Sequence, residues 1–434
     1  MNIKELYALY QQHPCVTTDS RNCPAGSIFL ALKGASFNGN KFAAQALEKG
    51  CSYAVVDEPQ WAVAGDARYI VVDDALTTYK ELARAHRRQF DIPVIGITGT
   101  NGKTTTKELV SAVLAKKYHV LHTEANYNND VGVPKTLLRL TKEHEIAVVE
   151  MGASHPGDIE RLVKYVEPTC GMITNVGRAH LEGFGSFEGV KRTKGELYDF
   201  LRASDALLFL NEDDNNLMEM AKERQFDRIA TYGTEPTADV RGSLLACDPF
   251  LSFSFQANAA LTPQPLEVHS QLIGAYNMSN MLAAVAIGLH FGVTAQDAAD
   301  ALREYKPSNN RSQLTVTEHN RLIVDAYNAN PSSMAAAIEN FRLMQAEHKM
   351  AILGDMRELG EASAVEHVVD LLERDGFKDV WLVGPEFSAT KTNYRKFHDV
   401  EEVRKAIAKE QPTDRTILIK GSNGDHLFEL PESL

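Results

Sequence analysis

Cysteine is scarce in this 434-residue sequence, and its few copies show no pairing pattern. The sequence contains no Cys-x-x-Cys spacing. This argues against a disulfide framework and a structural zinc site, and it favours a reducing compartment. The five cysteines are Cys15, Cys23, Cys51, Cys170 and Cys247.

Long apolar runs are also missing. The longest apolar segment, Met281 to Val293, contains a histidine and two glycines and is too short to span a bilayer. The N-terminal stretch carries Lys4 and Glu5 and lacks the apolar core of a signal peptide. We therefore expect no membrane insertion and a cytoplasmic protein.

Basic residues are outnumbered, with 45 Lys and Arg against 58 Asp and Glu and a formal net charge of −13. A net acidic chain argues against nucleic acid or an anionic membrane as the main partner. An anionic substrate would need a local cluster of cations or a bound metal ion. Hydrophobic residues make up 44% and charged residues 24%, which is typical of a soluble globular protein.

The chain is too long for one compact core, and short β-branched runs alternate with amphipathic helical stretches. This pattern predicts an α/β protein of three domains, at residues 1–90, 91–306 and 307–434. The central domain is expected to be a doubly wound sheet with a P-loop, and the third a small Rossmann-like domain. Alternating residues at 250–255 and 266–272 predict an antiparallel flap, and a helix is expected from Asn277 to about Phe291. The other expected strands are 27–32, 53–56 and 69–72; then 94–98, 146–150, 172–175, 206–210 and 228–232; then 322–325, 350–353, 380–383 and 417–419.

The segment VIGITGTNGKTTT, residues 94–106, carries the strongest single signal. A buried strand enters a turn in which Gly99 and Gly102 let backbone amides crowd around phosphate oxygens, and a helix N-terminus follows. Lys103 would reach the β- and γ-phosphates, and Thr104 would bind Mg²⁺. Ile97 occupies the place of the first glycine of the commoner spacing, so the loop is a G-x-x-G-K-T variant. An incidental glycine turn is disfavoured, but the loop alone does not choose between kinases, hydrolases and ligases.

Metal candidates follow two neighbouring apolar runs. Glu150 ends one predicted strand, and His180 and Glu182 follow the next. Each alone could be a surface or packing residue, but together beside a phosphate loop they indicate a Mg²⁺ site. Lys194 lies in VKRTKGELY, which is either a solvated helix start or a source of a functional cation.

Nine short segments follow one another along the chain: GTNGKTTT, NYNNDVGVP, EMGASHPGDI, NVGRAHLEGFGS, KGELY, AYNMSNMLAA, NNRSQ, DAYNANPSSM and LGDMRELG. Because these segments occur in the order typical of the Mur ligase family, the sequence resembles that family over nearly its whole length. The resemblance implies an ADP-forming amide ligase that uses ATP, two Mg²⁺ ions and an acyl-phosphate intermediate. Its substrates would be UDP-N-acetylmuramoyl-tripeptide and D-alanyl-D-alanine, in peptidoglycan synthesis, and we expect a monomer. Other amide-forming relatives, amino-acid-adding or folylpolyglutamate-like, stay open, as does a P-loop phosphoryl-transfer enzyme.

The resemblance also implies roles for individual residues. The first domain would bind the UDP-sugar, the second ATP and the third the incoming amine. Lys194 would be carbamylated by CO₂ and so become a metal ligand. The implied catalytic residues are Lys103, His180 and Lys194, and the implied metal ligands are Thr104, Glu150, His180 and Lys194. The implied ATP contacts are Gly99, Thr100, Asn101, Gly102, Lys103, Thr104 and Thr105 at the phosphates, Asn277 and Asn280 near the adenine, Arg311 at the phosphates and Asp325 at the ribose. The implied substrate contacts are Ser20 and Arg21 at the uridine, with Asn126, Asn129, Asn328 and Asn330 around the reacting groups.

Overall fold

The computed structural model describes residues 1–179, 181–307, 311–356 and 363–434. The chain separates into two compact units. Unit 1 contains Met1–Gly96, His119–Met151 and Glu160–Pro168, and unit 2 contains Ile97–Tyr118, Gly152–Ile159 and Thr169–Leu434. The domain boundaries expected after residues 90 and 306 stay a prediction.

Unit 1 begins with a four-stranded parallel sheet in the order β1-β2-β3-β4. One face of this sheet packs on α1 and α3 through Leu6, Tyr10 and Leu82, and the other face packs on α2. Further along the chain, β6 and β7 pair in parallel, and α5 packs against α3. The elements are α1 (Ile3–Gln12), β1 (Val16–Thr17), β2 (Ile28–Leu30), α2 (Ala43–Glu48), β3 (Tyr53–Val56), β4 (Tyr69–Val71), α3 (Ala75–Arg87), β6 (Val120–His122), α5 (Gly132–Leu137) and β7 (Ile146–Glu150); α6 (Asp158–Val166) begins in unit 2.

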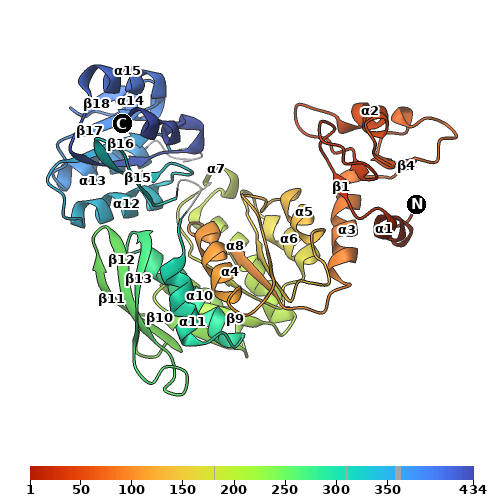
Figure 1. Ribbon diagram of the computed structural model, residues 1–434, viewed down its shortest axis with the longest axis horizontal. Coiled ribbons are helices and arrows are strands. Elements are labelled where there is room, and N and C mark those ends of the chain that lie inside the picture. The colour runs from red at the N-terminus through yellow and green to blue at the C-terminus, as the bar shows by residue number, and fades with distance from the viewer. Residues whose placement is uncertain (180, 308–310, 357–362) are drawn as a thin grey trace. The chain divides into compact units, whose positions relative to one another are not determined.

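A nine-stranded sheet carries the phosphate loop. Unit 2 holds its strands in the order β13-β12-β11-β10-β9-β8-β5, and the division between the units falls within β5 (Val94–Thr98). Strand β5 is buried along its length, and α4, α10 and α11 pack together beside the sheet (Figure 1). The elements are α4 (Lys103–Leu114), β8 (Cys170–Ile173), α7 (Leu181–Phe184), α8 (Phe187–Ala203), β9 (Leu207–Asn211), α9 (Asn215–Arg224), β10 (Ile229–Gly233), β11 (Val240–Cys247), β12 (Phe250–Gln256), β13 (Leu266–Ile273), α10 (Asn277–His290) and α11 (Ala295–Glu304).

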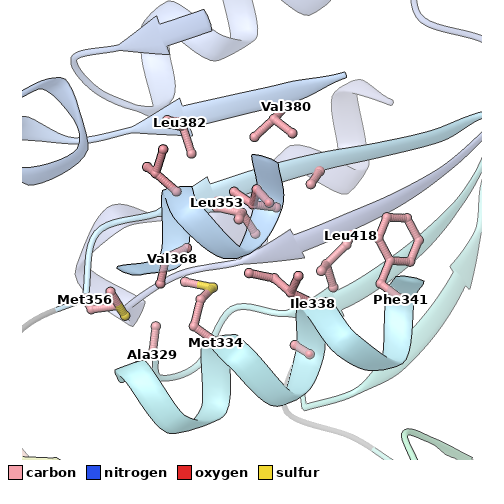
Figure 2. Close-up of a cluster of buried hydrophobic side chains, with 14 of the residues drawn as sticks. Ala329, Met334, Ile338, Phe341, Leu353, Met356, Val368, Val380, Leu382 and Leu418 are labelled. Atoms are coloured by element: carbon pink, nitrogen blue, oxygen red, sulfur yellow. The ribbon is translucent and has the colours of Figure 1, made fainter. Parts of the chain in front are cut away.

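A six-stranded sheet follows in unit 2, in the order β14-β15-β19-β16-β17-β18, with every pairing parallel except β14 with β15. Its two faces have separate apolar cores. Figure 2 shows the first core, where Met334, Ile338 and Phe341 of α12 face Leu353 and Leu418 of the sheet. The elements are β14 (Gln313–Val316), β15 (Asn320–Asp325), α12 (Pro331–Leu343), β16 (Lys349–Gly354), α13 (Ser363–Arg374), β17 (Val380–Val383), α14 (Pro385–Ser388), β18 (Arg395–Phe397), α15 (Val400–Glu410) and β19 (Arg415–Lys420).

The structure confirms the mixed α/β class and most of the expected strands. The antiparallel flap is present as β12 and β13, together with β11, which the sequence reading missed. Strand β8 lies two residues before the stretch expected at 172–175. Among the described residues, no helix combines the length and apolar character that crossing a membrane requires.

Candidate active site

The phosphate loop between β5 and α4 is built around two glycines in the left-handed region. Gly99 has φ +143° and Gly102 has φ +78°. A Cβ at Gly99 would stand 2.0 Å from Thr174 Oγ1, and one at Gly102 would stand 2.9 Å from Asn280 Oδ1. No side chain is therefore tolerated at either position, and Gly102 brings no side-chain cap to the first amides of α4. An uncapped helix N-terminus of this kind favours an anion.

The segment after β8 holds the loop in place. The Asn175 carbonyl accepts a hydrogen bond from the Thr100 amide at 3.0 Å, and its side chain accepts one from the Asn101 amide at 3.0 Å. The Thr174 hydroxyl donates to the Asn101 carbonyl at 2.6 Å. The loop is thus fixed before a ligand binds, which reduces the entropy lost on binding.

Two predicted phosphate-binding side chains lie at the start of α4. The Lys103 ammonium donates to the carbonyls of Gly99 and Thr100, both at 2.9 Å, so it is folded back over the loop. Thr104 is buried. Thr104 and Thr105 line a narrow cavity of about 10 Å³ together with Arg311.

Arg311 adds a second cation to this region. Its guanidinium lies 4.0 Å from the centre of the Tyr327 ring. Within the described residues, its Nε is buried and has no hydrogen-bond partner. The Nε of Arg311 is therefore a donor available beside Thr104 and Thr105, in a cavity that also includes Glu108 and has room for no more than about one water molecule.

Asn277 and Asn280 link neighbouring elements of unit 2, and the place near the adenine that the resemblance implies for them stays a prediction. Both are buried, and they form a chain of hydrogen bonds. Thr106 Oγ1 donates to Asn280 Oδ1 at 3.0 Å, Asn280 Nδ2 donates to Asn277 Oδ1 at 2.9 Å, and Asn277 Nδ2 donates to the Ile273 carbonyl at 2.8 Å. In this arrangement they tie α4 to α10 and β13.

Lys194 is a buried lysine on α8. Its Nζ lies 3.5 Å from the Ala153 carbonyl and 5.3 Å from the centre of the Phe184 ring. Burial, reinforced by the positive charge of Lys103, holds the pKa of Lys194 well below its usual value. Lys103 and Lys194 are therefore close enough to repel each other.

In unit 1, Glu150 ends β7 with a buried side chain. Its Oε1 accepts a hydrogen bond from Asn128 Nδ2 at 2.8 Å, and its amide donates to Thr123 Oγ1 at 3.0 Å. The neighbouring Asn129 instead accepts from the amides of residues 131 and 132 at the start of α5. Asn126 is exposed. The sequence analysis does not predict a role for Asn128, although this residue lies between Asn126 and Asn129, the two predicted substrate contacts.

The remaining predicted residues fall in three places. Asp325 Oδ2 accepts a hydrogen bond from the buried Lys420 at 2.6 Å, a partner that the sequence reading also missed. Asn330 caps α12 and donates to Asn101 Oδ1 at 2.7 Å, while the Asn328 carbonyl accepts from Lys420.

Ser20 and Arg21 lie in a loop of unit 1, where Arg21 pairs with Asp19. His180 lies outside the described residues.

The oxygen ligands present suit Mg²⁺, which prefers carboxylate and hydroxyl groups. Glu150 supplies a carboxylate and Thr104 a hydroxyl. The described residues contain no cluster of three or more His, Cys, Asp or Glu able to hold a metal.

Family models cover most of the chain. A model described as "Mur ligase family, catalytic domain" matches residues 14–91. A model described as "Mur ligase middle domain" matches residues 97–288, and one described as "Mur ligase, glutamate ligase domain" matches residues 310–423.

Individual relatives match over nearly the full length. The chain is 33% identical over 430 residues to the UDP-N-acetylmuramoyl-tripeptide--D-alanyl-D-alanine ligase of Escherichia coli (strain K12), a match that covers 96% of this chain and 93% of the relative. A crystal structure of MurF from Acinetobacter baumannii is 30% identical, with a TM-score of 0.88 and coverage of 98% and 97%. A crystal structure of MurF ligase from Thermotoga maritima in complex with ADP is 26% identical, with a TM-score of 0.85 and coverage of 96% of each chain.

Proposed function

The chain belongs to the Mur ligase family, and we propose that it joins D-alanyl-D-alanine to UDP-N-acetylmuramoyl-tripeptide at the expense of ATP. The reaction would supply a peptidoglycan precursor and release ADP and phosphate. The observation that carries this proposal is the similarity to ligases of that activity over almost the whole chain, combined with a preformed phosphate loop. ATP and a UDP-linked sugar as substrates favour a site of action in the cytoplasm. The monomeric state expected from the sequence stays a prediction.

ATP would bind at the phosphate loop. The amides at the start of α4 and the Lys103 ammonium would bind its phosphates, for which Lys103 must leave the two carbonyls that it now contacts. Arg311, whose Nε has no partner among the described residues, would donate to phosphate oxygens, for which the narrow cavity beside Thr104 and Thr105 must widen. Asp325, held by Lys420, would accept from the ribose hydroxyls.

Thr104 and a carbamylated Lys194, both in unit 2, would contribute ligands to the two expected Mg²⁺ ions. Glu150 of unit 1 and His180 stay predicted ligands. When bound, the two ions would screen the negative charges that meet when a carboxylate approaches a triphosphate. The burial of Lys194 supports its carbamylation, because CO₂ reacts with a neutral amine and burial disfavours the charged form.

A carboxylate does not react with an amine at neutral pH, so it must first be activated. The terminal carboxylate of the tripeptide would attack the γ-phosphorus of ATP, giving an acyl phosphate and ADP. The amine of D-alanyl-D-alanine would then attack the acyl carbon, and the tetrahedral intermediate would collapse to an amide and phosphate. Lys103 and Arg311 would offset charge on the transferred group. No dedicated base is assigned, because an α-amino group of pKa about 7.7–8.0 is partly neutral at pH 7.

Isotope transfer tests the proposed reaction. UDP-N-acetylmuramoyl-tripeptide labelled with oxygen-18 in its terminal carboxylate is incubated with ATP, Mg²⁺ and D-alanyl-D-alanine. The label is expected in the released phosphate, because the acyl phosphate breaks at the acyl carbon. Amide formation with unlabelled phosphate would rule out this route. Phosphate release in the absence of both carbon substrates would instead favour a nucleotide-hydrolysing enzyme.

A further inference from the structure

Three cysteines lie near one end of the four-stranded sheet in unit 1. Cys15 immediately precedes β1, and Cys51 lies two residues before β3. The parallel register places Val16 beside Ile28 and Ile28 beside Tyr53, so the starts of these strands are neighbours. Cys23 comes from the loop between β1 and β2. Three segments that are separate in the sequence therefore bring their thiols to one region.

Cys23 and Cys51 lie in the same part of the apolar core of unit 1. Cys23 packs against the apolar cluster that contains Cys51, and a hydrogen bond of 2.8 Å from the Gly26 amide to the Gly50 carbonyl joins the two segments close to these residues. Cys51 is buried, with its Sγ 3.2 Å from Ser27 Oγ. Cys23 is partly exposed. A small oxidant can therefore reach the Cys23 thiol, whereas the Cys51 thiol is buried.

The Cys23 thiol also touches the loop that is expected to bind uridine. Its Sγ donates to the Ser20 carbonyl at 3.5 Å and lies 3.9 Å from the Asp19 carbonyl. The Lys49 ammonium donates to the same Ser20 carbonyl at 2.8 Å. The position of Ser20 and Arg21 thus depends in part on where the sulfur of Cys23 lies.

We propose that Cys23 and Cys51 form a reversible disulfide that weakens binding of the UDP-linked substrate. A peroxide is the oxidant. The Cys23 thiol takes one oxygen from hydrogen peroxide, giving a sulfenic acid and water. The Cys51 sulfur then attacks the Cys23 sulfur, forming the S–S bond and releasing a second water. Two thiols are oxidised and one peroxide is reduced, and a small dithiol reverses the step.

Two features of the site favour this order of events. Burial raises the pKa of the Cys51 thiol to about 11, so Cys51 is a poor first target for an oxidant that reacts with thiolates. Bond formation removes the Cys23 hydrogen atom that is shared with the Ser20 carbonyl and draws the sulfur toward Cys51. The loss of one such contact is expected to lower substrate affinity about fivefold to tenfold. This consequence rests on the proposed function, whereas the bond itself does not.

Mass spectrometry tests the bond directly. The full-length protein is treated with hydrogen peroxide, free thiols are blocked, and the chain is cleaved with trypsin. The three cysteines then fall in separate peptides, Glu5–Arg21, Asn22–Lys33 and Gly50–Arg68. We expect Asn22–Lys33 linked to Gly50–Arg68, with the link lost after dithiothreitol. A link involving Glu5–Arg21 instead, or no link, would overturn the assignment.

Calorimetric titration with UDP-N-acetylmuramoyl-tripeptide tests the consequence. Peroxide should raise the Kd about fivefold to tenfold in the wild type and in Cys15→Ser, which keeps the reactive pair, and dithiothreitol should restore it. Cys23→Ser and Cys51→Ala should be insensitive to peroxide. A confirmed disulfide with an unchanged Kd would refute the effect on the loop. Absence of binding in the reduced wild type would count against the proposed function and leave the disulfide result intact.

Discussion

At the residue scale, Lys194 is unusual because a cationic side chain is buried beside a second cation, Lys103. Such a position is costly for an ammonium group and is explained if the amine becomes a carbamate. Lys194→Ala should lower amide formation by at least about a hundredfold, the scale expected for removal of a group that organises transition-state charge. Formate or acetate should partly restore the rate by replacing the missing carboxylate in the cavity.

Lys191 provides the matched control for this variant. It lies one turn earlier on the same helix, where its ammonium pairs with the exposed Glu219 at 2.7 Å. Lys191→Ala should retain activity and show no response to formate. Full activity of Lys194→Ala would mean that the lysine has no part in the reaction, and loss without rescue would argue against the carbamate.

Asn128 gives a second prediction, because its amide holds one oxygen of the buried Glu150. Partners of metal ligands orient them, and their removal typically costs 10–100-fold in metal affinity. Asn128→Ala should therefore raise the Mg²⁺ concentration needed for half-maximal activity about tenfold to a hundredfold, with activity regained at high Mg²⁺. The measurement is a Mg²⁺ titration of the initial rate. An unchanged titration curve would show that Glu150 is positioned without Asn128.

At the element scale, the asparagine pair of α10 connects three elements. Asn280 accepts from Thr106 of α4 and donates to Asn277, which donates to the carbonyl of Ile273 in β13. Removing one amide leaves buried polar groups unpaired, which costs about 1–3 kcal/mol. Asn280→Ala should lower the free energy of unfolding by that amount, as measured by chemical denaturation. Ser279→Ala, at a partly exposed neighbouring position, is the control, and equal stability of the two variants would contradict the network's role.

Helix α3 carries a buried histidine that links stability to pH. His86 Nε2 lies 2.8 Å from the Leu140 carbonyl and its Nδ1 lies 3.1 Å from the Tyr7 hydroxyl, with Tyr10 and Phe90 at its ring edges. Burial lowers the His86 pKa below the ordinary value of 6.5. His86 is therefore protonated more readily in the unfolded chain than in the folded chain. As a result, the free energy of unfolding is highest well above pH 6.5, where His86 is neutral in both states, and it declines as the pH falls through and below 6.5.

Denaturation at pH 7.5 and at pH 5.5 measures this effect. The wild type should lose more stability between these values than His86→Gln, which cannot take up a proton. His398→Gln removes an exposed histidine and should keep the wild-type difference, since its ring is 78% exposed. An equal pH dependence in all three proteins would mean that His86 does not contribute.

The elements also show what the sequence can and cannot predict. Strands β5 and β7 were predicted to the residue, because each is an unbroken apolar run that ends at a polar or glycine-containing turn. Strand β11 was missed because Gly242 and a shift of register between Leu244 and Ala246 interrupt its alternation. The spacing of Asn277 and Asn280 is visible in the sequence, but Thr106, whose hydroxyl donates to Asn280, is far away in the chain. The sequence likewise does not show that Asn128, and not Asn126 or Asn129, binds Glu150, because this depends on the direction of each side chain in the folded chain.

At the scale of the whole molecule, the net negative charge of the chain opposes the binding of anionic substrates unless cationic side chains gather at the site. The chain carries a net charge of −13, yet the proposed substrates are a triphosphate and a UDP-linked peptide. Cations are therefore concentrated where they are needed, with Lys103, Lys194 and Arg311 in unit 2. The proposed uridine-binding loop with Arg21 belongs to unit 1. The two substrates are thus assigned to different compact units.

This division predicts that each ligand alone protects its own unit from hydrogen exchange. At a concentration of about 100 times its Kd, a ligand should slow local openings of its site about a hundredfold. ADP with Mg²⁺ should slow exchange at residues 97–106 and 311–330, and UDP-N-acetylmuramoyl-tripeptide should slow it at residues 18–33. Lys103→Ala should abolish the first effect and keep the second. Protection of residues 18–33 by ADP alone would show that the nucleotide and the uridine share one site, and the assignment of one substrate to each unit would then fail.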